Sequence, residues 1–136
     1  MAEHVLRAKL QTAGLEHVVI SAGTGSWHVG QAAHPSTQRV LAEAGYTNDH
    51  RAQQFTASWF DELDLIVVMD RSNLRNVQAL AKTDTQRAKV KLLRSFDPTA
   101  ANDAEVPDPY DGPYSGYLEV LAMVEAACDG LVATLN

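Results

Sequence analysis

The sequence has little cysteine, little positive charge and no long apolar run. Its only cysteine, Cys128, excludes an intrachain disulfide and any zinc site built from several cysteines. One cysteine suits a reducing compartment, so we expect a cytoplasmic protein. No apolar stretch reaches membrane-spanning length, and the first residues lack the apolar core of a signal peptide, so we expect no membrane segment.

Negative charge predominates in the chain. There are 11 Lys and Arg residues against 17 Asp and Glu, which gives a net charge of -6 and an isoelectric point near 5.2. Such a chain repels polyanions, which argues against nucleic acid as a partner. The histidines and the acidic cluster Asp61, Glu62 and Asp64 show no metal-ligand spacing. We therefore predict no metal and no other cofactor.

The size and the apolar content predict one domain over residues 1–136. At 14.8 kDa with 46% hydrophobic residues, the chain can form its own core, and it contains no repeat or low-complexity segment. Spacing and capping residues predict helices and strands in alternation. The helices are expected at about 1–13, 34–44, 57–62, 72–81 and 116–135, and the strands at 18–20, 63–69 and 90–93.

This alternation predicts an α/β fold, a three-layer sandwich in which helices flank a short parallel sheet. Residues 63–69 read as a central strand because the run is apolar almost throughout, whereas residues 18–20 read as a second buried strand. Three strands are few for a covered parallel sheet, and a helix at residue 1 would ordinarily follow a strand. We therefore expect a first strand to be absent from this chain, which would make the domain N-terminally truncated.

One acidic residue stands in an unusually stiff context. Asp108 lies between Pro107 and Pro109 in the polar segment 97–116, and segments this long in small domains are usually functional. The prolines fix the backbone on both sides, which suits a general acid that must meet a leaving-group oxygen. The alternative is a tight surface turn.

Aromatic and polar residues in other loops could surround such an acid. Trp27 and Tyr110 could form the walls of a slot for a flat ring, or pack as ordinary semi-buried aromatics. Ser21 and His50 could suggest acyl transfer, but Ser21 has no Gly-x-Ser-x-Gly context and no third member is evident.

Cys128 is the only candidate thiol nucleophile. A catalytic thiolate needs a helix N-terminus or a nearby cation, whereas Cys128 falls on the apolar stripe of the last predicted helix, near its C-terminal end. We therefore predict a buried structural cysteine.

Several separated segments together resemble one family, the bacterial-type low-molecular-weight protein tyrosine phosphatases. The matching segments are Met1-Ala2-Glu3, Ser21-Ala22-Gly23-Thr24-Gly25-Ser26-Trp27-His28-Val29-Gly30, Asp49-His50-Arg51-Ala52, Val68-Met69-Asp70-Arg71-Ser72-Asn73-Leu74, Leu92-Leu93-Arg94-Ser95-Phe96-Asp97-Pro98 and Asp108-Pro109-Tyr110. Their order and spacing make the set more specific than any single motif.

The resemblance implies hydrolysis of phosphotyrosine through a cysteinyl-phosphate intermediate, on a phosphotyrosine protein or an aryl phosphate. Asp108 would be the general acid and then the base for water, and Trp27 and Tyr110 would line the aryl slot. Ser21 and His50 would support the phosphate-binding loop by hydrogen bonds to its asparagine. Where many members have a second tyrosine, this chain has Asp111, which adds negative charge at the rim of the pocket.

The chain departs from this family at the phosphate loop. The family carries a first strand, central in its sheet, and a Cys-x5-Arg-Ser-Pro loop ahead of Met-Ala-Glu, and this chain starts at that Met. Without thiolate, arginine and loop amides we expect a chain that does not catalyse. The alternative is a non-catalytic pseudophosphatase that binds a partner. Unpaired sheet edges would also favour self-association.

Two other interpretations of the α/β pattern fit less well. An arsenate reductase needs several redox cysteines, and a flavodoxin- or response-regulator-like domain does not account for the Asp-Pro-Tyr and Trp segments together.

Overall fold

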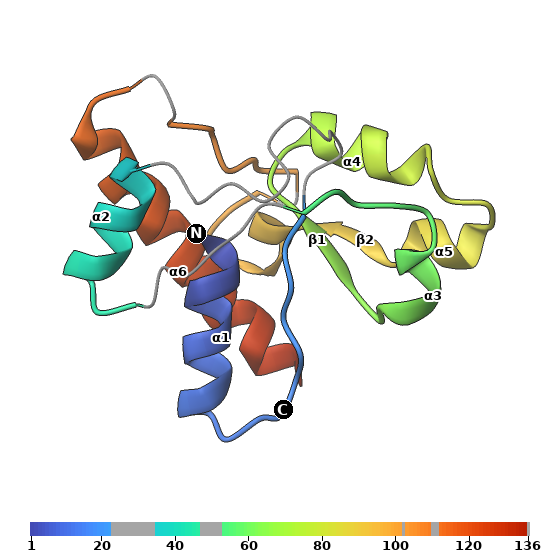
Figure 1. The fold of residues 1–136 in the computed structure, drawn as a ribbon, viewed down its shortest axis with the longest axis horizontal. Helices are drawn as coiled ribbons and strands as arrows, with labels where there is room; N and C mark the ends of the chain where they lie inside the picture. The colour runs from blue at the N-terminus through green and yellow to red at the C-terminus, as the bar shows by residue number, and fades with distance from the viewer. Residues whose placement is uncertain (23–34, 47–52, 102, 110–111, 136) are drawn as a thin grey trace.

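The computed structural model describes residues 1–22, 35–46, 53–101, 103–109 and 112–135. Helices flank a small parallel sheet in which strand β1 (Ile66–Val68) pairs with β2 (Val90–Leu92), with Val67 opposite Lys91. Figure 1 shows α1 (Ala2–Thr12), α2 (Pro35–Glu43) and α6 (Tyr114–Leu135) on one side of the sheet. The short helices α3 (Trp59–Glu62), α4 (Arg71–Gln78) and α5 (Asp84–Ala88) lie on the other side. The predicted α/β fold is confirmed.

Each face of the sheet has its own apolar core. Ile66 and Val68 of β1 pack with Phe60 and Val77 on the α3 and α4 side. The intervening Val67 packs against the larger core formed by α1, α2 and α6. This alternation follows from the pleat of a strand, which sends successive side chains to opposite faces.

Local signals place most helix boundaries close to those predicted. Gly14 and Gly45 follow α1 and α2 with φ of +72° and +87°, the left-handed conformation that favours glycine. Asp70 caps α4 by accepting a hydrogen bond from the Asn73 amide at 2.7 Å. The last helix begins at Tyr114, two residues before the predicted start.

The predicted strand at residues 18–20 is wrong. Residues 15–22 form neither helix nor strand, and Val18 is 92% exposed. Within the described residues β1 pairs with β2 alone, so residues 18–20 have no strand beside them to complete a ladder. The carbonyl of Val19 instead accepts a hydrogen bond from the Arg7 guanidinium at 2.8 Å. For the same reason β1, predicted as a central strand, has one neighbour in the described part of the chain.

Smaller differences concern the segments that follow β1. Strand β1 is shorter at both ends than the predicted 63–69. At its carboxyl end the Met69 carbonyl accepts the Val106 amide, and ahead of it the Leu63 amide still donates to the Trp59 carbonyl of α3. Helix α4 ends at Gln78, three residues before the predicted end, and Leu80 beyond it is 38% exposed. Helix α5 was not predicted, and the Thr83 side chain caps it. A 3-10 turn, η1 (Leu93–Phe96), connects β2 to the loop that carries Asp108.

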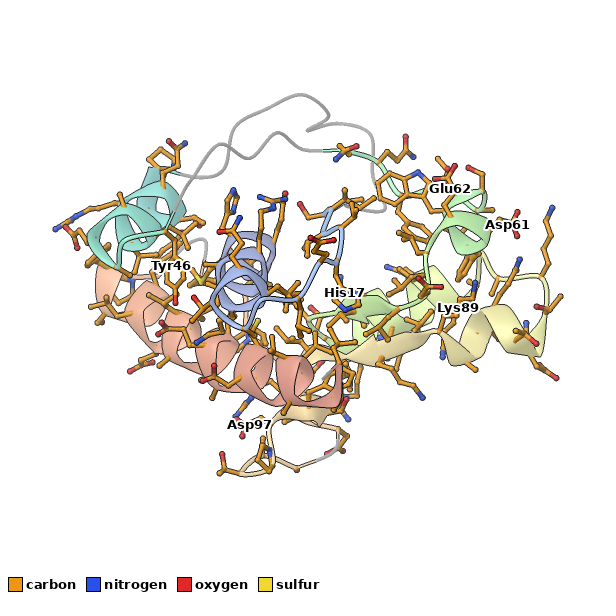
Figure 2. The ribbon with its side chains drawn as sticks, turned by 90° about the horizontal axis from the view of Figure 1, so that it is seen from below. His17, Tyr46, Asp61, Glu62, Lys89 and Asp97 are labelled. Carbon is orange, nitrogen blue, oxygen red and sulfur yellow. The ribbon has the colours of Figure 1, made fainter. Side chains whose placement is uncertain are left out.

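The acidic residues at and just after α3 lie at the surface. Asp61, Glu62 and Asp64 are exposed, as expected for solvated charges, and Figure 2 shows Asp61 and Glu62 pointing outward from α3. In the described part of the chain, no helix combines the length and apolarity needed to cross a membrane.

Candidate active site

The loop that carries Asp108 lies against the carboxyl end of β1. Met69 directly follows β1, and its carbonyl accepts a hydrogen bond from the Val106 amide at 2.7 Å. The Met69 amide donates a hydrogen bond to the Asn73 side chain, in the first turn of α4, at 3.3 Å. Ligands of open α/β sheets bind outside the carboxyl ends of the strands, so Asp108 lies at the end of the sheet where a site is expected.

Asp108 itself is exposed, only two residues beyond a buried anchor. The Val106 side chain is 4% exposed and belongs to the larger core, whereas Pro107 faces solvent. After Asp108 the chain turns, and the Gly112 amide donates to the Pro109 carbonyl at 2.8 Å. The carboxyl group is therefore accessible to a substrate, while the backbone that carries it is tied to the core.

Glu105, three residues before Asp108, anchors the loop to α4 and η1. Its carboxylate accepts a hydrogen bond from the Arg71 backbone amide at 2.7 Å, and its Oε1 lies 3.4 Å from the Arg71 guanidinium. Its carbonyl accepts a hydrogen bond from Arg94 Nη1 at 3.1 Å. The hydrogen bond from the Arg71 amide, followed by the Arg71 side chain, lowers the pKa of Glu105 below its ordinary value.

The far end of the loop is fastened to α2. The Tyr114 hydroxyl donates to Glu43 at 2.5 Å, and Arg39 pairs with Glu43 at 3.0 Å. The Arg39 guanidinium also lies 4.1 Å from the centre of the Tyr114 ring, a cation–π contact. The hydrogen bonds from Tyr114 and then Arg39 lower the pKa of Glu43, and the same carboxylate raises the pKa of Tyr114.

Ser21 is held against the first turn of α1. Its hydroxyl donates to Glu3 Oε1 at 2.5 Å, and the other oxygen of Glu3 pairs with Arg7 at 2.6 Å. The Ser21 carbonyl accepts a hydrogen bond from the Gln53 side chain at 3.4 Å. Of the five residues predicted for the site, the structure thus describes Asp108 and Ser21. Trp27, His50 and Tyr110, as well as Asp111, lie outside the described residues.

The prediction of a buried structural cysteine is confirmed for Cys128. Its side chain is fully buried on α6, in the core shared with α1. Burial raises the pKa of the thiol to about 12, so the reactive thiolate is strongly disfavoured. Cys128 does not have the properties of a nucleophile.

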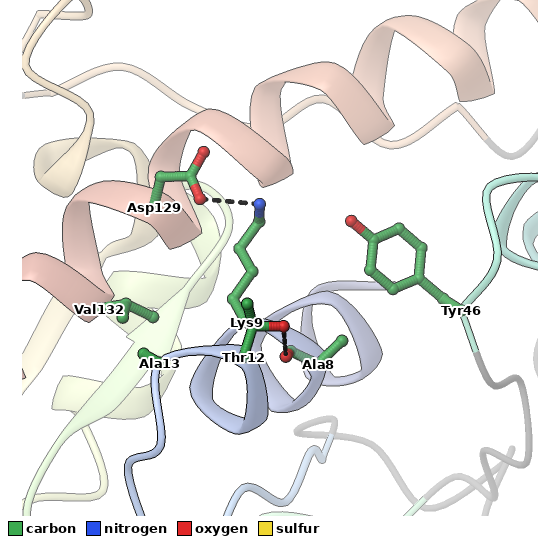
Figure 3. Close-up of a pocket in the computed structure, with 7 residues that line it drawn as sticks. All are labelled: Ala8, Lys9, Thr12, Ala13, Tyr46, Asp129 and Val132. Carbon is green, nitrogen blue, oxygen red and sulfur yellow. Dashed lines mark hydrogen bonds and ion pairs between the residues drawn. The ribbon is translucent and has the colours of Figure 1, made fainter.

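Two hollows accompany these elements. One, of about 430 Å³, adjoins the loop and is lined by Asp70, Arg94, Glu105, Val106, Pro107 and Met123. The other, of about 370 Å³, lies between α1 and α6, where Lys9 pairs with Asp129 at 2.7 Å (Figure 3). Because that ammonium is neutralised by its partner, the second hollow offers no evident anion site. Among the described residues, no three His, Cys, Asp or Glu side chains gather to hold a metal ion.

Known proteins resemble the chain over its whole length. The family model described as low molecular weight phosphotyrosine protein phosphatase matches residues 1–136. The chain belongs to this family. A low molecular weight protein-tyrosine-phosphatase of Streptomyces coelicolor is 53% identical over 139 residues, covering 100% of this chain and 85% of the relative. A low molecular weight protein-tyrosine phosphatase A of Mycobacterium bovis is 41% identical, covering 96% and 80%.

Solved structures of protein tyrosine phosphatases share this fold. A protein tyrosine phosphatase of Entamoeba histolytica superimposes with a TM-score of 0.92 at 31% identity, covering 98% of this chain and 86% of that one. The resemblance implies a Cys-x5-Arg motif for this family, and these 136 residues do not contain that motif. The only cysteine is Cys128, and Thr134 stands where the motif would require arginine.

Sequence reasoning singled out Asp108 and missed the residues that hold its loop. The Arg39 and Glu43 pair could have been found, since the two are four residues apart on a helix. Neither Glu105 nor its partners Arg71 and Arg94 carry a comparable signal, because their contacts join distant parts of the chain.

Proposed function

We propose that Asp108 is the general acid of a phosphotyrosine phosphatase and that these 136 residues form the single domain that carries it. The observation that supports this most directly is the anchored loop, which presents an accessible carboxyl group at the carboxyl end of β1 in a member of this family. Asp108 would protonate the tyrosyl oxygen as its bond to phosphorus breaks. It would then take a proton from the water that attacks the cysteinyl phosphate.

The remaining predicted residues take supporting roles in this proposal. Trp27 and Tyr110 would line the slot for the aryl ring of a phosphotyrosine protein or an aryl phosphate. Ser21 and His50 would stabilise the phosphate loop. The contact between Ser21 and Glu3, in the first turn of α1, is consistent with such a role. A single cysteine also supports a reducing compartment, and we propose a cytoplasmic location.

The second part of the proposal is that this chain alone does not turn over substrate. Its one thiol is buried with a raised pKa, and these 136 residues contain no Cys-x5-Arg segment to supply a thiolate and a phosphate-clamping arginine. Removing one member of a catalytic unit already abolishes most of its catalysis.

A direct experiment compares two proteins. The 136-residue chain should show no turnover of phenyl phosphate, whereas the same chain joined ahead of Met1 to a family strand and Cys-x5-Arg-Ser-Pro loop should be active. In the joined form, Asp108→Asn should lower kcat for phenyl phosphate by about 10²- to 10⁴-fold, the range of general acid catalysis. The matched control is Asp103→Asn, an exposed aspartate in the same loop, which should leave kcat unchanged. Equal effects of the two substitutions would refute the assignment.

A non-catalytic binding module is the second candidate, favoured by the inert environment of Cys128. Inactivity of a correctly folded joined form would support it. So would coding DNA ahead of Met1 that lacks an in-frame Cys-x5-Arg-Ser-Pro sequence.

We also propose that the chain self-associates. Among the described residues β1 has one strand neighbour, and the β-branched Val18 and Ile20 are exposed. Size-exclusion chromatography across a concentration series should show dimers or larger species, and a monomer at every concentration would contradict this.

A further inference from the structure

Three contacts that precede Asp108 in the loop converge on Glu105. The carboxylate lies against the first turn of α4, where it accepts the Arg71 amide at 2.7 Å and approaches the Arg71 guanidinium at 3.4 Å. The carbonyl of the same residue accepts a hydrogen bond from Arg94 of η1 at 3.1 Å. One residue thus ties the loop to α4 through its side chain and to η1 through its main chain.

These contacts lie close enough to Asp108 to set its direction. Val106, the next residue, is buried and donates its amide to the Met69 carbonyl at 2.7 Å. Only Pro107 separates Val106 from Asp108, and its ring fixes φ near -65°. A displacement at Glu105 would therefore be passed to Asp108 across few rotatable bonds.

The contact is well suited to fixing a position and poorly suited to stabilising the fold. The Arg71 amide is one of the donors at the start of α4 that lack a partner within the helix, and the helix dipole favours a carboxylate there. The Glu105 side chain is 38% exposed and that of Arg71 is 57% exposed, and ion pairs this open contribute little to stability. Catalysis is more sensitive, because a misplacement of about 1 Å can slow a reaction by about 10²-fold.

We propose that Glu105 is a positioning residue: by holding the loop on α4, it directs the Asp108 carboxyl group toward the oxygen of the departing aryl group. This inference rests on the proposed role of Asp108 as general acid. Figure 1 shows the loop, in orange, running from the sheet toward α2 and the start of α6. The Tyr114, Glu43 and Arg39 contacts hold that other end, so a loop released at Glu105 remains attached there.

The first test uses the 136-residue chain itself. In Glu105→Ala, amide hydrogen exchange at Val106 should accelerate about tenfold or more, while exchange in β1 and β2 stays within about twofold of the parent, as expected for local opening. The control is Glu119→Ala, which removes an exposed glutamate from α6. Unchanged exchange at Val106 would overturn the proposal.

The second test uses the active joined form and two leaving groups. A poor leaving group needs the acid, and kcat/KM reports the steps up to its departure, before the common cysteinyl phosphate is hydrolysed. Glu105→Ala should therefore lower kcat/KM for phenyl phosphate about tenfold and kcat/KM for p-nitrophenyl phosphate less than about threefold. Glu105→Gln keeps the length and an acceptor oxygen, so it should recover part of the loss. Equal losses on both substrates would indicate general damage and overturn the positioning role.

Asp108→Asn, measured alongside, separates the two proposals. If this variant lacks the leaving-group dependence, the general-acid assignment fails. If Asp108→Asn shows the dependence and Glu105→Ala does not, the positioning role alone fails.

Discussion

Replacing Gly130 with alanine probes how closely α6 packs against η1. A Cβ atom on Gly130 would lie 1.8 Å from the Phe96 carbonyl oxygen and 2.8 Å from the Phe96 carbonyl carbon. Both are main-chain atoms, so no side-chain rotation relieves the overlap. Because protein interiors are close-packed, either α6 or η1 would have to move by roughly 1 Å.

Two opposing effects determine the sign of the change. Glycine to alanine inside a helix ordinarily stabilises by about 0.5–1 kcal/mol, because alanine has less backbone freedom to lose. Overpacking costs about 1–3 kcal/mol, and a clash with main chain belongs at the upper end. We therefore expect Gly130→Ala to lower the free energy of unfolding by about 2 kcal/mol.

The same helix offers a matched control. Among the described residues, a Cβ atom on Gly116 would meet nothing nearer than the Pro109 Cβ at 3.9 Å, so Gly116→Ala should raise the free energy of unfolding by up to about 1 kcal/mol. Urea unfolding followed by circular dichroism measures both variants, with equal m-values showing that only stability has changed. If Gly130→Ala were as stable as Gly116→Ala, the close approach of α6 to η1 would be refuted.

Three further predictions concern burial, charge and capping. Cys128 should resist iodoacetamide in the native protein and react on unfolding in urea, because it is fully buried with a thiol pKa of about 12; rapid native labelling would contradict this. Glu43 and Glu105 have lowered pKa values when folded, so their contribution to stability is present above the ordinary value of 4.5 and lost as the pH falls through the folded values. Urea midpoints between about pH 3 and 7 should therefore fall toward acid, and less steeply in Glu105→Gln. Asp70→Ala should reduce stability by about 1 kcal/mol in thermal or urea unfolding, because α4 loses its N-cap, and an unchanged midpoint would argue against the cap.

The helices could be predicted because their signals are local. A glycine with positive φ ends α1 at Gly14 and follows α2 at Gly45, and the Asp70 side chain begins α4. The apolar stripe of α6 likewise predicts the burial of Cys128 in the core. Such features depend on residues a few positions apart, which a sequence shows directly.

The strands depend on partners elsewhere in the chain, and here local reasoning was insufficient. The run from Val18 to Ile20 has the β-branched composition of a buried strand, yet Val18 is almost fully exposed. Composition indicates that a segment can pair, whereas pairing itself requires a neighbouring strand with free backbone groups. The same reasoning explains why β1 is shorter than the apolar run that contains it.

In the candidate site too, local features could be predicted from the sequence and long-range contacts could not. The stiffness around Asp108 could be predicted from two prolines in the sequence, but its direction depends on Glu105 meeting Arg71, 34 residues away. At the other end of the loop, Tyr114 meets Glu43 across 71 residues. A related chain could therefore keep the Pro-Asp-Pro sequence and lose the Glu105 contact. Its sequence motif would be complete, but its aspartate would have a different orientation. On the proposed general-acid role, the pairing of Glu105 with Arg71 is thus a better indicator of a catalytically competent loop than Asp108 alone.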